Sequence, residues 1–201
     1  TRTLPMFRLR RDAEITKNVY RRISVLQCEG SNPSDPWAFR GLLMFMMNTS
    51  SGLFRTNEQL KDKGLSLSGN HFENDKEQWV PLIEGKMIHH FDDRFGTYLG
   101  QTQAQANKGF LPQLSNEDHG DPEFHAIPRY WVPRADVEGR LAGRTNRGWL
   151  VGWRDITGSE KERTVIATVV PRVACGDTFL IGILNLPQAS MFAASLSSYS
   201  L

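Results

Sequence analysis

The chain has 201 residues, of which 39% are hydrophobic and 23% charged, and its formal net charge is +2. This composition is ordinary for a globular protein with a buried core. Since no apolar run approaches the ~20 residues of a membrane-spanning helix, we expect no membrane partner. The two cysteines, Cys28 and Cys175, are far apart and form no CxxC pair, which favours free thiols and a reducing, cytoplasmic setting.

Residues 1–30 predict a basic helical segment. Ile15, Val19 and Ile23 recur at helical spacing, and Asp12 is suited to cap a helix that runs to Ile23. Residues 1–22 carry seven Lys or Arg side chains against two acids, and residues 129–172 carry nine against five. This asymmetry suits a protein with one face toward a polyanion, although a solvated charged surface would have the same composition.

The segment between residues 27 and 77 predicts one strand and one helix between two loops. Residues 27–36 are rich in Gly, Pro, Ser and Asn, which indicates a connection. The apolar run 37–47 is short, aromatic and interrupted by Gly41, which favours a strand over a helix. Capping residues precede a predicted helix over 52–63, and the polar residues 63–77 predict a loop.

The stretch from Trp79 to Tyr98, WVPLIEGKMIHHFDDRFGTY, concentrates titratable and aromatic side chains. A strand is predicted over 79–83, followed by a turn at Glu84-Gly85. Nine residues then contain Lys86, His89, His90, Asp92, Asp93 and Arg94. Such a cluster has the residue types to hold a metal ion, a phosphate or a nucleobase.

The remaining chain predicts a sheet. Residues 101–125 are expected to form a long polar loop, a short edge strand covers 127–132, and 136–141 form a helical turn or two. Three β-branched and aromatic runs predict strands over 149–155, 164–170 and 178–184, and a helix enters near Gln188. We therefore expect an α+β fold in a single domain over 1–201, with a mixed sheet built mainly from the C-terminal third and short flanking helices.

Two clusters have the composition of metal sites: His89, His90, Asp92 and Asp93, and Asp118, His119, Asp121, Glu123 and His125. Adjacent histidines on a strand point to opposite faces, so His89 and His90 would not readily share one ion. The first cluster nevertheless leaves a metal-dependent hydrolase or nuclease open as an alternative function. Our main expectation is that the chain holds no metal.

Basic side chains beside aromatic residues or glycines indicate a second kind of site. Arginine clamps phosphates bidentately or contacts guanine edges, and lysine offers a point charge. The alternative is that Arg94 pairs with Asp92 or Asp93, and Arg154 with Asp155, as surface salt bridges. The candidate DNA-binding residues are Lys86, His89, His90, Arg94, Arg129, Arg154 and Arg163.

Several catalytic motifs do not occur in the sequence. It contains no GxxxxGK[ST], GxGxxG, GxSxG or HExxH pattern, and Asn32-Pro33 is followed by Ser-Asp rather than by Pro and an aromatic residue. We therefore expect no catalytic residue and no cofactor in this chain. A purely structural subunit-contact domain is the remaining alternative.

The order of the sequence blocks resembles one region of large bacterial adenine-specific DNA methyltransferases, of the type IIG-like restriction–modification kind with relatives in BREX-type phage defence. The blocks are PMFRLRRDAEITKNVYRRISVL, PWAF…LMFMMNTSSGLFRT, WVPLIEGKMIHHFDDRFGTY, RYWV and WRDIT…ERTVIATVVPR. The similar region is the target-recognition (specificity) part, C-terminal to the methyltransferase core.

The resemblance implies a module that reads double-stranded DNA and presents the target adenine to a methyltransferase core of the same polypeptide. S-adenosylmethionine would bind in that core and not in this chain. In such proteins a helix and further recognition segments follow the point where this sequence ends, so we expect a truncated recognition domain.

Overall fold

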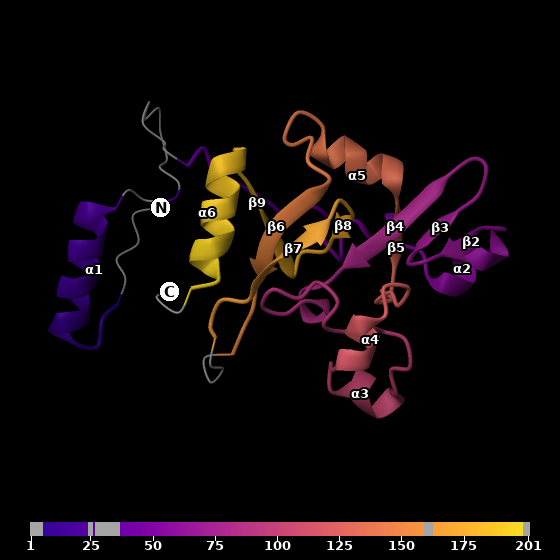
Figure 1. Ribbon diagram of the computed structural model, residues 1–201, viewed down its shortest axis with the longest axis horizontal. Coiled ribbons are helices and arrows are strands. Elements are labelled where there is room, and N and C mark those ends of the chain that lie inside the picture. The colour runs from indigo at the N-terminus through magenta and orange to yellow at the C-terminus, as the bar shows by residue number, and fades with distance from the viewer. Residues whose placement is uncertain (1–5, 24–25, 27–36, 159–162, 199–201) are drawn as a thin grey trace. The chain divides into compact units, whose positions relative to one another are not determined.

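The computed structural model describes residues 6–23, 26, 37–158 and 163–198 (Figure 1). Its helices and largely antiparallel sheets make an α+β fold, as predicted. The chain forms two compact units, residues 1–40 and 41–201. None of the described helices is long and apolar enough to cross a membrane. The predicted loop 27–36 and Cys28 lie outside the described residues.

The first unit contains helix α1 (Arg10–Arg22), which confirms the predicted N-terminal helix. Its apolar side chains, among them Ile15 and Val19, are exposed. The expected cap is wrong: Leu9 is the N-cap residue and makes no side-chain capping bond. Asp12 lies in the first turn instead, where its charge favours the helix through the positive end of the dipole.

The first sheet of the second unit is the one predicted from the C-terminal third. Its order is β1 (Arg40–Leu42), β9 (Phe179–Ile183), β6 (Trp149–Arg154) and β7 (Ala167–Pro171). Strand β6 pairs antiparallel with both β7 and β9. A Cβ at Gly152 would lie 2.3 Å from the carbonyl oxygen of Leu180, so only glycine fits at this point of β6.

A second sheet comes from the middle of the chain. Its strands are β2 (Ser66–Ser68), β3 (His71–Glu73), β4 (Gln78–Ile83) and β5 (Trp131–Pro133), with β8 (Ala174–Cys175) pairing in parallel with β4. Strand β4 is buried at five of its six residues, which explains its nearly continuous apolar sequence. The predicted loop over 63–77 is wrong, because β2 and β3 form a hairpin through a turn in which Gly69 has a φ of +61°.

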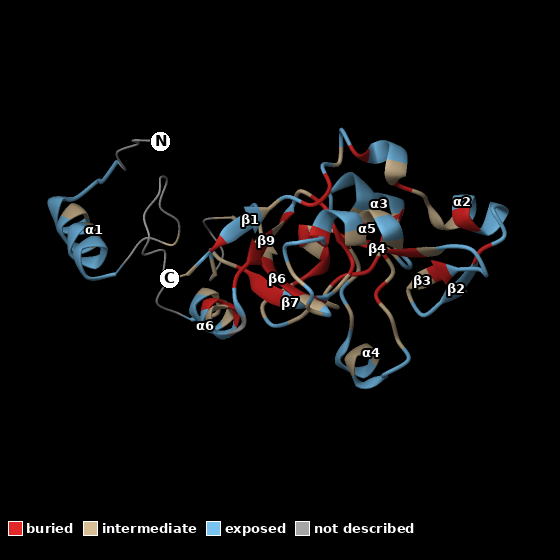
Figure 2. Cartoon of the chain, turned by 90° about the horizontal axis from the view of Figure 1, so that it is seen from above, coloured by how far each residue is buried: buried red, intermediate tan, exposed pale blue. Residues whose placement is uncertain are grey.

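The two sheets share one hydrophobic core, seen as the red interior in Figure 2. Val80, Leu82 and Ile83 of β4 contribute to it together with side chains from β6, β7 and β9. Helix α5 (Arg134–Leu141) buries Val137 and Leu141. Helix α6 (Leu186–Leu196) lies on the first sheet, where the rings of Phe192 and Trp153 meet edge to face at 5.7 Å.

The predicted strand over 37–47 is wrong outside Arg40–Leu42. Met44 and Phe45 are fully buried without belonging to a strand. Their main chain is satisfied in another way: the Phe45 N–H donates to the carbonyl of Cys175, and the Met47 N–H donates to the Asp177 carboxylate, both at 3.1 Å. An apolar run can therefore supply core here without continuing the ladder.

Short helices replace longer predicted segments in two places. The helix predicted over 52–63 divides into a 3₁₀ turn, η1 (Ser51–Leu53), and α2 (Asn57–Asp62), because Arg55 between them exchanges main-chain hydrogen bonds with Trp131. The expected polar loop over 101–125 contains α3 (Gln103–Asn107) and α4 (Asn116–Gly120). Each of these two helices begins with a reciprocal capping box.

Candidate functional site

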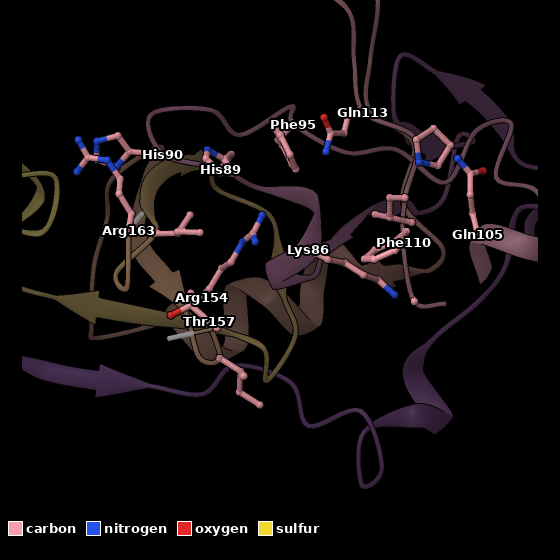
Figure 3. Close-up of a pocket in the computed structure, with 16 residues that line it drawn as sticks. Lys86, His89, His90, Phe95, Gln105, Phe110, Gln113, Arg154, Thr157 and Arg163 are labelled. Carbon is pink, nitrogen blue, oxygen red and sulfur yellow. The ribbon is translucent and has the colours of Figure 1, made fainter. Parts of the chain in front are cut away.

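A pocket of about 1250 Å³ opens in the second unit (Figure 3). Its walls come from three regions of the chain: 86–95 after β4, 105–113 at and after α3, and the described residues 154–158 and 163–166 between β6 and β7. Five of the seven predicted site residues line it: Lys86, His89, His90, Arg154 and Arg163. Among the described residues of its lining there is no carboxylate, so every charged side chain of that described lining is cationic.

Lys86 is presented by the 3₁₀ turn η2 (Gly85–Met87), which follows β4 directly. Gly85 is required in this turn, because a Cβ there would lie 2.3 Å from the carbonyl oxygen of Thr178. The Lys86 Nζ lies 3.5 Å from Glu84 Oε2 and 5.0 Å from the centre of the Tyr98 ring. Burial and the neighbouring Glu84 raise the pKa of Tyr98, so its hydroxyl stays protonated and donates to Glu84 Oε1 at 2.7 Å.

Arg154 extends into the pocket from the end of β6, toward His89 (Figure 3). Its Nε and Nη2 both donate to the carbonyl oxygen of Ile88, and its guanidinium lies 5.7 Å from the Phe95 ring centre. Burial lowers the pKa of Arg154 from its ordinary value, which means that its charge is partly desolvated. In the described part of the chain it makes no ion pair with Asp155, so that predicted salt bridge is wrong.

His89 and His90 lie in a tight turn at one end of the pocket. The main chains of His89 and Asp92 exchange hydrogen bonds of 2.7 and 3.0 Å, and Phe91 between them has a φ of +58°. Burial and, next, Arg154 lower the pKa of His89, while burial and Arg163 lower that of His90. Since both pKa values fall below the usual value of about 6.5, both rings are neutral at pH 7.

Arg163 approaches the same end from the segment before β7, and Figure 3 shows its guanidinium beside the His90 ring. Its Nη1 donates to the carbonyl oxygen of Ser197 at the C-terminal end of α6, at 3.2 Å. A contact between the pocket and α6 therefore fixes this arginine.

The other end of the pocket has residues that the sequence analysis did not single out: Gln105, Phe110 and Gln113. Phe110 is 64% exposed although it lines the pocket. The capping box of α3 orients Gln105, whose Oε1 accepts from the Thr102 N–H at 2.9 Å. The Thr-x-x-Gln spacing of that box was readable in the sequence and would have placed Gln105 at a helix start.

Arg94 and Arg129 do not line the pocket. Arg94 donates from Nη2 to the carbonyl of His119 at 3.0 Å and from Nη1 to the carbonyl of Phe124 at 3.1 Å, so it fastens α4 and the segment after it. Its predicted salt bridge with Asp92 or Asp93 is wrong, although its N–H donates to Asp92 Oδ1. Arg129 is exposed, with its guanidinium 5.0 Å from the Tyr130 ring centre.

Two acids of the possible metal clusters, Asp92 and Asp118, have other partners. Asp92 pairs with His119 at 3.2 Å, and Asp118 caps α4 by accepting from Ser115 at 2.8 Å. Burial raises the pKa of Asp93. Over residues 6–23, 26, 37–158 and 163–198, no three His, Cys, Asp or Glu side chains form a group that could hold a metal ion.

Comparison with protein-family models, with curated proteins and with solved structures found no match for this chain. The chemistry of the pocket therefore carries the functional argument. Its cations attract an anion, and its exposed ring and amide groups suit a flat polar molecule.

Proposed function

We propose that the chain is a sequence-recognition module of an adenine-specific DNA methyltransferase and that its pocket contacts DNA. One observation carries the DNA part of this proposal: the described lining contains three cationic side chains and two histidines but no carboxylate. Cationic side chains that are gathered in a pocket and partly shielded from water attract phosphate groups from solution.

The methyltransferase part rests on the resemblance of the sequence blocks. Two of those blocks contribute to the pocket: EGKMIHHFDDRFGTY supplies Lys86 and both histidines, and WRDIT…ERTVIATVVPR supplies Arg154 and Arg163. The partner within the same polypeptide would be a methyltransferase core that binds S-adenosylmethionine and methylates the adenine. This chain would select the DNA sequence and supply no catalytic group.

The cationic side chains of the pocket suit phosphate contacts, and its amide side chains suit contacts with bases. Lys86 and Arg163 would contact phosphates, and Arg154, held against the Ile88 carbonyl, would add a fixed charge. Phosphate contacts of this kind give affinity without sequence information. The amides of Gln105 and Gln113 would contact base edges, for which glutamine has suitable donors and acceptors.

The test is a salt titration of binding to a labelled duplex, with Lys86→Gln compared against Lys76→Gln. Each variant removes one lysine charge, but Lys76 is exposed in the β3–β4 turn and does not line the pocket. We expect wild-type affinity to fall steeply between about 50 and 200 mM salt and K86Q to lower the slope of log K against log salt by about 1. K76Q should keep the wild-type slope.

A flat salt dependence of the wild-type protein would contradict the proposal, because releasing counterions from DNA requires a slope. Equal effects of K86Q and K76Q would contradict the assignment of the contact to the pocket.

A further inference from the structure

The two ends of the pocket differ in chemistry. The cationic end consists of His89, His90, Arg154 and Arg163, and the ring end consists of Lys86, Gln105, Phe110 and Gln113 (Figure 3). We propose that the pocket takes one unpaired nucleotide of a DNA strand, with its phosphate at the cationic end and its base against Phe110. The inference rests on the proposed function, since the nucleotide would be part of the bound DNA.

The cationic end is already arranged for an anion. Two donors of Arg154 are fixed on the Ile88 carbonyl, and Arg163 donates to that of Ser197, so neither guanidinium has to be ordered when a phosphate arrives. The desolvation that lowers the pKa of Arg154 also strengthens its attraction for a negative ligand. Fixed charges of this kind bind phosphate at a small entropic cost.

The ring end is built for a flat group. The Phe110 N–H donates to the Gln105 carbonyl at 2.9 Å, and the Phe110 carbonyl accepts from the Gln101 side-chain amide at 2.6 Å. The backbone is thus held while the ring remains 64% exposed. An exposed aromatic ring beside cations is the arrangement on which unpaired bases stack, whatever their identity.

A base inside a duplex does not fit this geometry. Both of its faces are covered by neighbouring base pairs, so Phe110 can stack only on a base that has left the duplex or was never paired. The volume of about 1250 Å³ exceeds that of typical small-ligand pockets, which reach about 1000 Å³, but is too small to enclose a duplex. Gln105 keeps its Nε2 amide available for the edge of the base, since no acceptor for it appears in the described part of the chain.

The histidines make this binding depend on pH. The charged groups around His89 are Arg154, Arg163, Asp92 and His90, and Arg163 also faces His90. A phosphate among them would favour the protonated imidazoles, so binding would be accompanied by proton uptake. Affinity for the nucleotide therefore rises as the pH falls through the pKa values that the two imidazoles have in the complex.

The test compares labelled duplexes that are identical except for one bulged, unpaired nucleotide. We expect the bulged duplex to bind about 10-fold more tightly than the paired duplex, and Phe110→Ala to abolish that preference. Leu99→Ala is the matched control, because Leu99 is 57% exposed and lies outside the pocket lining. It should leave the preference unchanged. Circular dichroism of each variant verifies that it is folded.

The outcomes separate this inference from the proposed function. Salt-dependent binding without any preference for the bulge overturns the inference and leaves the proposed function standing. A preference that F110A and L99A reduce equally also overturns it, because the preference would then come from elsewhere. Failure of both duplexes to bind overturns the two together.

Discussion

Arginine side chains in the second unit bond mainly to main-chain carbonyls. Arg172 donates to the carbonyls of Thr145 and Arg147 and also to the Glu138 carboxylate. Arg140 donates to the main-chain carbonyl of Met44. Outside the pocket, guanidinium groups with such partners fix the segments to which they bond. Arg94 belongs to this group, whereas Arg154 combines a carbonyl contact with a position in the pocket.

Replacing Arg94 with Ala removes the donors for the His119 and Phe124 carbonyls. We expect the free energy of unfolding in urea to fall by about 1–2 kcal/mol, with DNA affinity per folded molecule unchanged. Arg129→Ala removes the same charge from an exposed side chain that has no carbonyl partner among the described residues, and it should change stability by less than about 0.5 kcal/mol. Equal losses in the two variants would refute the structural role of Arg94.

His119 makes stability depend on pH. The Ser115 carbonyl, 2.8 Å from Nδ1, and then Asp92, 3.2 Å from Nε2, raise the pKa of His119 above its usual value. Because the folded pKa is the higher one, the stabilisation is fully present below about pH 6.5 and is lost as the pH rises through the folded pKa. In urea denaturation, the free energy of unfolding of wild type should therefore exceed that of His119→Gln by more at about pH 5.5 than at about pH 8.5. A difference that grows with pH would show the sign to be wrong.

At the scale of elements, three short helices depend on capping boxes. Helices α2, α3 and α4 begin with Thr56, Thr102 and Ser115, and each cap bonds reciprocally with the third residue of its helix. Helices of five or six residues are too short to be stable by themselves, so their caps matter more than they would in long helices. The cap of α3 is also the contact that orients Gln105 in the pocket.

Thr102→Ala and Thr56→Ala form a matched pair, because each removes the same kind of cap. Either variant should lose about 1 kcal/mol of unfolding free energy. Only T102A should also weaken DNA binding, since α2 contributes nothing to the described lining of the pocket. Unchanged DNA binding by T102A would mean that the orientation of Gln105 is not used.

The elements also show how far periodicity reaches in this chain. Strands β4, β6, β7 and β9 were predictable because their apolar runs are buried in one shared core. The run 37–47 has the same composition, but in the described part of the chain the main chain of Phe45 forms a single bridge, to Gly176 just after β8. An apolar composition indicates that a segment is buried, but it does not indicate which main-chain groups the segment pairs with.

At the scale of the whole molecule, five of the seven predicted contact residues line one pocket, although Lys86 and Arg163 are 77 positions apart in the sequence. Residue type alone was enough to nominate them, because cations beside rings are suited to phosphates. It could not separate Arg94 from Arg154, since the difference lies in which distant carbonyl each guanidinium reaches. The ring end was missed for the same reason: Phe110 becomes a site residue only when 105–113 folds against 86–95.

The parallel pair of β4 and β8 has a consequence for probing this fold. Cys175 lies in that pair opposite Ile83, is fully buried, and has its pKa raised by burial. Only the thiolate attacks an alkylating reagent, so Cys175 is inert while it stays buried between the two sheets. In a chain whose Cys28 is replaced by Ser, the rate of alkylation would therefore report how often the core around Cys175 opens to solvent. Slower alkylation on adding DNA would show that the ligand suppresses these openings.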